Sequence, residues 1–254
     1  MNKIKLSLAV SALLISSSAM ADSWNIIQDV DVSATGANTV IKQTDSTTNG
    51  SVQSLNNINL GASSDLAASS KQTVKAGSNS LTLTQETSTS SSSQAANRTV
   101  AQDVADLIQS LEMSGGSINL NQNATVGGEN TQAVNEVTAV TTTDLSQQIT
   151  AVATALGMIQ EGNKNTQAGN LLNITTSTSS DAAKTKQTVS VNTVDLEQTS
   201  TTEGFQAGNA LIIGSAATGG AITQSLTAAS TLDMTQSGAN NSFQSANYAG
   251  VKTN

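Results

Sequence analysis

The sequence predicts an all-β protein, a β-solenoid or cross-β stack of about six repeats of ~38 residues, with roughly three short strands in each repeat. Three observations support this class: a short pattern recurs at a near-constant spacing, proline is absent from the 254 residues, and Ser, Thr, Asn, Gln, Gly and Ala dominate. A fixed period between about 20 and 50 residues is typical of stacked repeats. Proline cannot donate to a sheet ladder, so its absence agrees with a chain made of strands.

The recurring pattern is apolar, any residue, apolar, any residue, glutamine, and its glutamines anchor the repeat. The anchors are Gln43, Gln85, Gln122, Gln160, Gln198 and Gln236, at steps of 42, 37, 38, 38 and 38 residues. Because side chains alternate along a strand, the apolar residues and the glutamine point to the same face. A buried amide needs hydrogen-bond partners, which the equivalent glutamine of the next repeat supplies from about 4.8 Å away. We therefore expect a structural ladder of glutamines.

A second motif, glutamine followed three residues later by asparagine, comes after each anchor. Its asparagines are Asn56, Asn97, Asn135, Asn170, Asn209 and Asn247. Each asparagine is expected to share a strand face with the residue two positions after it and with the small residue two positions before it, as Asn135 with Val137 and Ala133. The asparagines are thus expected to form a second structural ladder.

A third strand is expected where a glutamine lies two residues before a usually apolar residue. The copies begin at Gln72, Gln109, Gln187 and Gln224, with a looser one at Gln148 and an unpaired one at Gln28. Helical spacing of apolar residues leaves a helix over 104–112 as an alternative. The strand is preferred there because Gln109 falls on the third-strand position.

The first 21 residues have the features of a secretory signal peptide, with Lys3 and Lys5, an apolar run from Leu6 to Ile15, and a small-residue cleavage site before Asp22. That run is too short to span a membrane, and no other approaches about 20 residues, so the mature chain is not expected to be transmembrane. Residues 22–42 are expected to form an N-terminal cap or half-repeat. Residues 43–254 are expected to form six stacked repeats starting near 43, 85, 122, 160, 198 and 236, the last truncated.

The charge and composition disfavour several functions. Without Lys3 and Lys5 the mature chain keeps 8 of 10 basic and all 18 acidic residues, a net charge of 8 − 18 = −10, so nucleic acid is not an expected partner. Cysteine and histidine are absent, which removes the usual nucleophilic triads and transition-metal clusters. We therefore expect no enzyme activity, cofactor or metal site. A β-helix polysaccharide enzyme is an alternative, but Asp29 and Asp31 are more typical of a solvated strand face.

Two anchor loops match a known repeat element. Residues 160–165 and 236–241 both fit Gln-x-Gly-x-x-Asn, carried by Gly162 and Asn165 in one loop and by Gly238 and Asn241 in the other. This element resembles the repeat of curlin-type functional amyloid subunits, although only two of the six repeats contain it in full. The resemblance implies export through an outer-membrane pore and assembly into cross-β biofilm fibres, with a nucleating subunit as a further partner.

Two functions of different classes follow from the repeat. One repeat buries too few aliphatic side chains to offset the entropy of ordering about 38 residues, so repeats must stack, and the last one leaves an unpaired edge. The leading interpretation is a secreted structural protein whose partner is itself, forming amyloid-like fibres at the cell surface. The alternative is a monomeric β-solenoid adhesin or surface-binding module that does not polymerise.

Overall fold

The protein is a β-solenoid of parallel strands, which confirms the predicted fold class. The computed structural model describes residues 23–35, 38–44, 51–61, 64–66, 69–86, 92–124, 129–175, 184–214 and 221–251. The expected signal peptide, residues 1–21, lies outside the described residues. Within those residues, no helix is long and apolar enough to cross a membrane.

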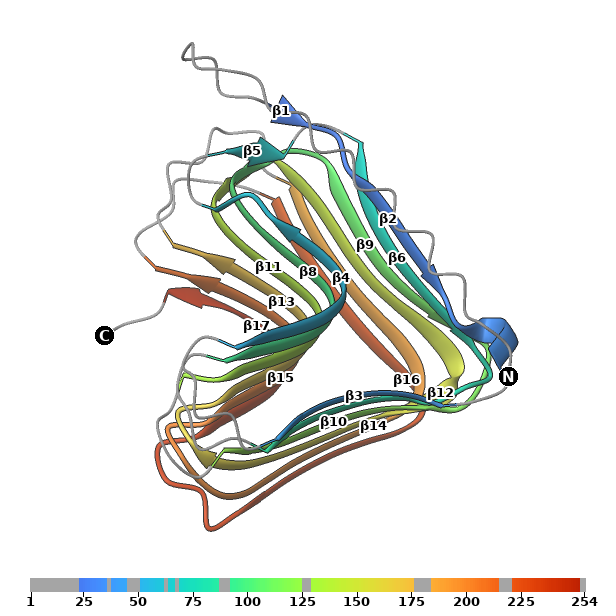
Figure 1. Cartoon of the computed structure of the whole chain (residues 1–254). Coiled ribbons are helices and arrows are strands. Elements are labelled where there is room, and N and C mark those ends of the chain that lie inside the picture. Colours follow the sequence, from blue (N-terminus) through green and yellow to red (C-terminus); the bar gives the residue numbers. More distant parts are fainter. Residues whose placement is uncertain are drawn as a thin grey trace.

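The strands form three walls around a common interior (Figure 1). Wall one contains β2 (Ile27–Asp31), β6 (Ser70–Gly77), β9 (Leu107–Met113) and the first parts of β12 (Asp144–Asn163), β14 (Lys184–Thr202) and β16 (Ala221–Ser237). Wall two contains β3 (Thr39–Thr44), β7 (Leu81–Glu86), β10 (Ser117–Ala124) and the last parts of β12, β14 and β16. Wall three contains β1 (Ser23–Trp24), β4 (Val52–Asn59), β5 (Asp65–Leu66), β8 (Ser93–Val104), β11 (Thr131–Thr142), β13 (Thr166–Ile174), β15 (Phe205–Ile213) and β17 (Phe243–Val251). A short 3-10 helix, η1 (Ser33–Thr35), lies between β2 and β3.

Each turn of the chain through the three walls forms one layer. Layer 1 contains β2, β3, β4 and β5; layer 2 contains β6, β7 and β8; layer 3 contains β9, β10 and β11. Layers 4, 5 and 6 contain β12 with β13, β14 with β15, and β16 with β17. β1 precedes layer 1 and pairs with the outer edge of β5. All pairings between layers are parallel, so each residue lies above its equivalent in the next layer at about 4.8 Å.

The interior contains two large apolar clusters. The first joins all three walls through residues such as Leu83, Leu111, Leu120 and Val134. The second lies between wall one and the end of wall three, and includes Ile58, Val104, Leu107, Val137 and Leu172. In layers 2 to 5 the apolar residues of the anchor pattern belong to the first cluster, because they alternate along wall two with outward residues.

Wall three bends toward the interior (Figure 1), and the bend corrects one expectation from the sequence. The register passes from Ala133–Ala168 to Asn135–Asn170 without pairing Val134. Val134 joins the interior cluster, whereas Ala133 lies in a separate small cluster with Leu171. The expectation that Asn135 shares a face with Ala133 is therefore wrong, because the bend interrupts the alternation of side chains.

The alternative of a helix over 104–112 is also excluded. β8 ends at Val104 and β9 runs from Leu107 to Met113, with a sharp corner at Asp106, whose φ is 52°. The apolar spacing that suggests a helix arises because the chain turns from wall three into wall one at this point. Val104 and Leu107 consequently face the same apolar cluster from two walls.

Candidate functional site

Four columns of amide side chains run through the interior from layer 1 to layer 6. The wall-two column is Gln43, Gln85, Gln122, Gln160, Gln198 and Gln236. The wall-one column is Gln28, Gln72, Gln109, Gln147, Gln187 and Gln224. Wall three has a glutamine column, Gln53, Gln94, Gln132, Gln167, Gln206 and Gln244, and an asparagine column, Asn56, Asn97, Asn135, Asn170, Asn209 and Asn247.

Each amide is bonded to the next in its column. In the wall-two column the donor–acceptor distances range from 2.6 to 3.1 Å. From layer 2 to layer 5 these glutamines are almost completely buried. A buried amide without a partner costs about 1–3 kcal/mol, so continuous columns hold each layer in register with its neighbours.

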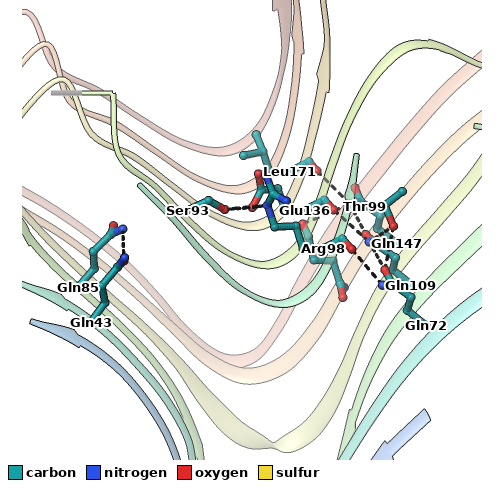
Figure 2. Close-up of polar contacts among 11 residues, drawn as sticks. Gln43, Gln72, Gln85, Ser93, Arg98, Thr99, Gln109, Glu136, Gln147 and Leu171 are labelled. Carbon is teal, nitrogen blue, oxygen red and sulfur yellow. Dashed lines mark hydrogen bonds and ion pairs between the residues drawn. The ribbon is translucent and has the colours of Figure 1, made fainter. Parts of the chain in front are cut away.

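Main-chain carbonyls fix the orientation of most of these amides. Gln147 donates from Nε2 to Gln109 Oε1 at 2.9 Å and also to the carbonyl oxygen of Leu171 at 3.0 Å (Figure 2). Asn97 likewise donates to the carbonyl oxygen of Ser110 at 3.0 Å. Because a carbonyl only accepts, the amide nitrogen must face it, and the amide oxygen is left for the neighbouring layer.

The columns have a direction. In all three glutamine columns, Nε2 donates to the glutamine of the preceding layer, as Gln85 does to Gln43 (Figure 2). In the asparagine column, Nδ2 donates to the following layer, as Asn56 does to Asn97 at 2.8 Å. The two ends of the solenoid therefore present different hydrogen-bonding groups.

The structure places the anchor glutamines and the motif asparagines in two of these columns, as expected. The other two columns, both of glutamine, were not expected from the sequence to be ladders. Gln147, not the expected Gln148, is the member from layer 4. Gln148 points outward, and its Nε2 bonds to Ser146 Oγ at 3.1 Å. Leu145 and Ile149 are buried and each lies two residues from Gln147, so the alternation of side chains along the strand indicates that Gln147 faces the interior.

The two curlin-like loops lie at the corner between walls two and three and differ in detail. Gly162 and Gly238 both have positive φ, 92° and 64°. Asn165 directly precedes β13, is buried, and donates from Nδ2 to the carbonyl oxygen of Glu161 at 2.9 Å. Asn241 lies one corner position earlier, is exposed, and has a φ of 50°. The two asparagines differ because one more residue separates Gln236 from its wall-three strand than separates Gln160 from its own.

A buried charged cluster lies on the outer side of the bend. Ser93 Oγ donates to Glu136 Oε2 at 2.6 Å, and Arg98 Nε lies 3.6 Å from the same oxygen (Figure 2). Burial raises the pKa of Glu136, while Arg98 and the hydrogen bond from Ser93 oppose that rise. In the next layers Leu171 and Ala210 occupy the position of Glu136. The charged cluster thus lies between layers 2 and 3, at a position where layers 4 and 5 have apolar side chains.

The C-terminal end face exposes residues that are interior everywhere else. Leu232 and Met234 are 46% and 38% exposed, whereas their equivalents one layer earlier, Val194 and Leu196, are 1% and 0% exposed. Phe243, which is 43% exposed, stacks on Phe205 with ring centroids 5.5 Å apart, and the Tyr248 ring packs at a steep angle against both, with centroids 5.0 Å away. The C-terminal end face therefore exposes side chains whose equivalents in the preceding layer are buried in the core.

The hydrogen-bonding groups of the two ends are complementary. Among the described residues, the Oε1 atoms of Gln224, Gln236 and Gln244 accept no hydrogen bond, and Asn247 Nδ2 donates none. At the other end, Gln28 and Gln53 each donate one hydrogen bond from Nε2 to a described residue, and Asn56 Oδ1 accepts none from one. Each end therefore offers the groups that the other lacks.

No protein family, curated protein or solved structure matches this chain. In the parts of the chain that the structure describes, no three acidic, histidine or cysteine side chains gather closely enough to hold a metal ion. The end faces and the four amide columns are therefore the candidate functional features.

Proposed function

We propose that the mature protein is a secreted structural subunit that assembles head to tail into amyloid-like fibres. In such a fibre, the C-terminal end face of one copy meets the N-terminal end face of the next, and the parallel layers continue across the contact. The curlin resemblance suggests a place at the cell surface, in a biofilm matrix or in surface adhesion, after export through an outer-membrane pore. A nucleating subunit would be an additional partner.

One observation carries this proposal: the four amide columns end with acceptors and donors that match the opposite end of the same molecule. The glutamine oxygens of layer 6 face the direction from which Gln28, Gln43 and Gln53 of a following copy would donate. The exposed core residues of the same face support it, because an uncovered apolar edge in a soluble monomer favours association. A contact made this way repeats the interactions between layers.

The test uses two neighbouring substitutions on the end face. Met234→Asp puts a charge into the interior column, where a following copy would bury it, yet the side chain is partly exposed in the single molecule. Thr235→Asp places the same charge on the outward face of the same strand. Fibre growth is followed by thioflavin fluorescence and fibre diffraction, with seeds of the unchanged protein.

Met234→Asp is expected to fold, as judged by circular dichroism, and to add to seeds at least tenfold more slowly. Thr235→Asp is expected to grow no more slowly than the unchanged protein, because Lys42 of a following copy would lie in the column of Thr235. Growth of Met234→Asp at the unchanged rate would contradict stacking through this face. If the unchanged protein stays monomeric in light scattering, the adhesin alternative is supported instead.

A further inference from the structure

The outward face of wall two has its charges separated along the solenoid axis. Lys42, the one basic side chain among the described residues of this wall, lies in layer 1 at the N-terminal end. Acidic side chains gather toward the other end, where layers 5 and 6 contain Asp195, Glu197 and Asp233. The C-terminal end of wall two is therefore acidic, and the matching cation lies at the N-terminal end.

The acidic end is not neutralised within one molecule. Asp195 and Asp233 lie directly opposite each other in neighbouring layers, on strands about 4.8 Å apart. Like charges in this position are destabilising. Among the described residues, no ion pair includes Asp195, Glu197 or Asp233. The repulsion is therefore left for a neighbouring molecule to offset.

Lys42 makes a diagonal ion pair between two layers of its own molecule. It lies opposite Thr84 in layer 2, and its Nζ is 3.5 Å from Oε2 of Glu86, two residues farther along the same strand. A lysine in this column therefore spans the diagonal to a neighbouring layer. The Lys42 side chain is 54% exposed, so its ammonium group remains open to a second carboxylate.

We propose, on the basis of the head-to-tail assembly proposed above, that Lys42 of the following copy forms an ion pair with Asp233 across the junction. Continuing the register places Lys42 over Thr235 and Val40 over Asp233. Asp233 is then two residues from the position opposite Lys42, on the diagonal that mirrors the one to Glu86. The lysine lies between carboxylates of two copies, and the partner at this surface is a second copy of the chain.

The same charges determine which walls of two copies meet. All three walls have a glutamine column of the same direction, so these amides alone do not select one rotation about the axis. At the N-terminal end, wall one exposes Asp29 and Asp31, which Asp233 would repel if the following copy were rotated by one wall. In the proposed register they lie over Ser225 and Thr227, whose hydroxyls can donate to a carboxylate. The ion pair across the junction therefore favours the rotation in which equivalent walls meet.

Charge reversal in two separate variants tests the ion pair. Lys42→Glu alone gives a junction with two carboxylates, and Asp233→Lys alone gives one with two ammonium groups. Each variant alone is therefore expected to form fibres at least tenfold more slowly than the unchanged protein. In an equimolar mixture, the glutamate introduced at position 42 meets the lysine introduced at position 233, and Lys42 of the second variant meets Asp233 of the first. Every junction of an alternating fibre then joins opposite charges.

Glu161→Lys is the matched control. It makes the same change of charge as Asp233→Lys on the outward face of wall two, but in layer 4, three layer spacings or about 14 Å from a following copy. Both substitutions lower the net negative charge of the chain. Slow assembly of Asp233→Lys alone would thus not arise from repulsion between whole molecules. Urea unfolding of the monomers checks that each variant folds.

Fibre formation is measured by thioflavin fluorescence and by the amount of protein that sediments. The samples are each variant, the equimolar mixture and the unchanged protein, all starting at Asp22, the expected mature start. We expect the mixture to form fibres within about threefold of the unchanged rate. Mass spectrometry of the sedimented fibres should find the two variants in equal amounts.

Two results would overturn the ion pair. Either reversal variant assembling alone as fast as Glu161→Lys would show that these charges do not face a like charge at the junction. A mixture as slow as the single variants would show that the two positions do not meet. The Met234→Asp comparison reports on stacking separately, so fibres that are blocked by Met234→Asp but indifferent to charge reversal would leave head-to-tail assembly intact. An unchanged protein that forms no fibres would overturn the assembly itself.

Discussion

Replacing Gln147 by leucine tests whether the amide columns stabilise the fold. Gln147 is fully buried and donates to Gln109 Oε1 and to the carbonyl oxygen of Leu171 (Figure 2). It also donates to the carbonyl oxygen of Asn135, and its Oε1 accepts from Gln187 at 2.8 Å. Leucine fills a similar volume but leaves Gln109 Oε1 without its donor and Gln187 without one acceptor. At about 1–3 kcal/mol for each of these two unsatisfied groups, we expect a loss of about 2–6 kcal/mol in the free energy of unfolding.

The matched control is Gln148→Leu, one residue away on the outer face. The side chain of Gln148 makes one hydrogen bond to a described residue, Ser146, so its replacement is expected to change the free energy of unfolding by less than about 0.5 kcal/mol. The assay is urea unfolding of monomeric protein followed by circular dichroism, with the midpoints compared at similar slopes. If both variants shift the midpoint equally, or if Gln147→Leu costs less than about 1 kcal/mol, the inference that satisfied amides stabilise the layers is refuted.

Three further changes probe the charged cluster, a corner and the bend. Because burial raises the pKa of Glu136, the folded state binds a proton on this carboxyl more tightly than the unfolded state does. The unchanged protein should therefore gain stability relative to Glu136→Gln as the pH falls from neutral, through the raised pKa, to the ordinary value of a glutamate. Urea midpoints measured between about pH 4 and 8 test this. Glu129→Gly, at a φ of 62°, should raise the free energy of unfolding by about 0.5–1 kcal/mol because glycine adopts this left-handed conformation without strain; a lower urea midpoint would contradict this. Gly208→Ala should destabilise layer 6 by about 1–3 kcal/mol and slow seeded growth, since its Cβ would meet Leu226 Cδ1 and lie 2.8 Å from the carbonyl oxygen of Ala246; unchanged growth and stability would show that the bend adapts.

The architecture could be predicted because its main determinants repeat along the chain. The anchors recur with their two apolar neighbours, and a period of two along wall two places Leu81, Leu83 and Gln85 on one face, as the structure shows. The asparagine motif recurs as regularly. Parallel stacking then follows, because equivalent residues of successive repeats must meet.

The bend and the layer boundaries could not be predicted in the same way. At Val134 the alternation of side chains breaks, and that break depends on packing between walls rather than on neighbours in sequence. Gln147 and Gln148 are adjacent and chemically identical, so the motif alone does not select one; the buried neighbours Leu145 and Ile149 do.

The four amide columns also bear on how such a chain can change its length. Layers 2 to 5 each meet both neighbours through equivalent amide positions, so the loss or duplication of one of these layers would restore equivalent contacts at the seam. Recombination between similar repeats within a gene could therefore produce shorter and longer proteins without new contacts having to arise. Chain length would then vary in steps of about one repeat, as in other solenoids.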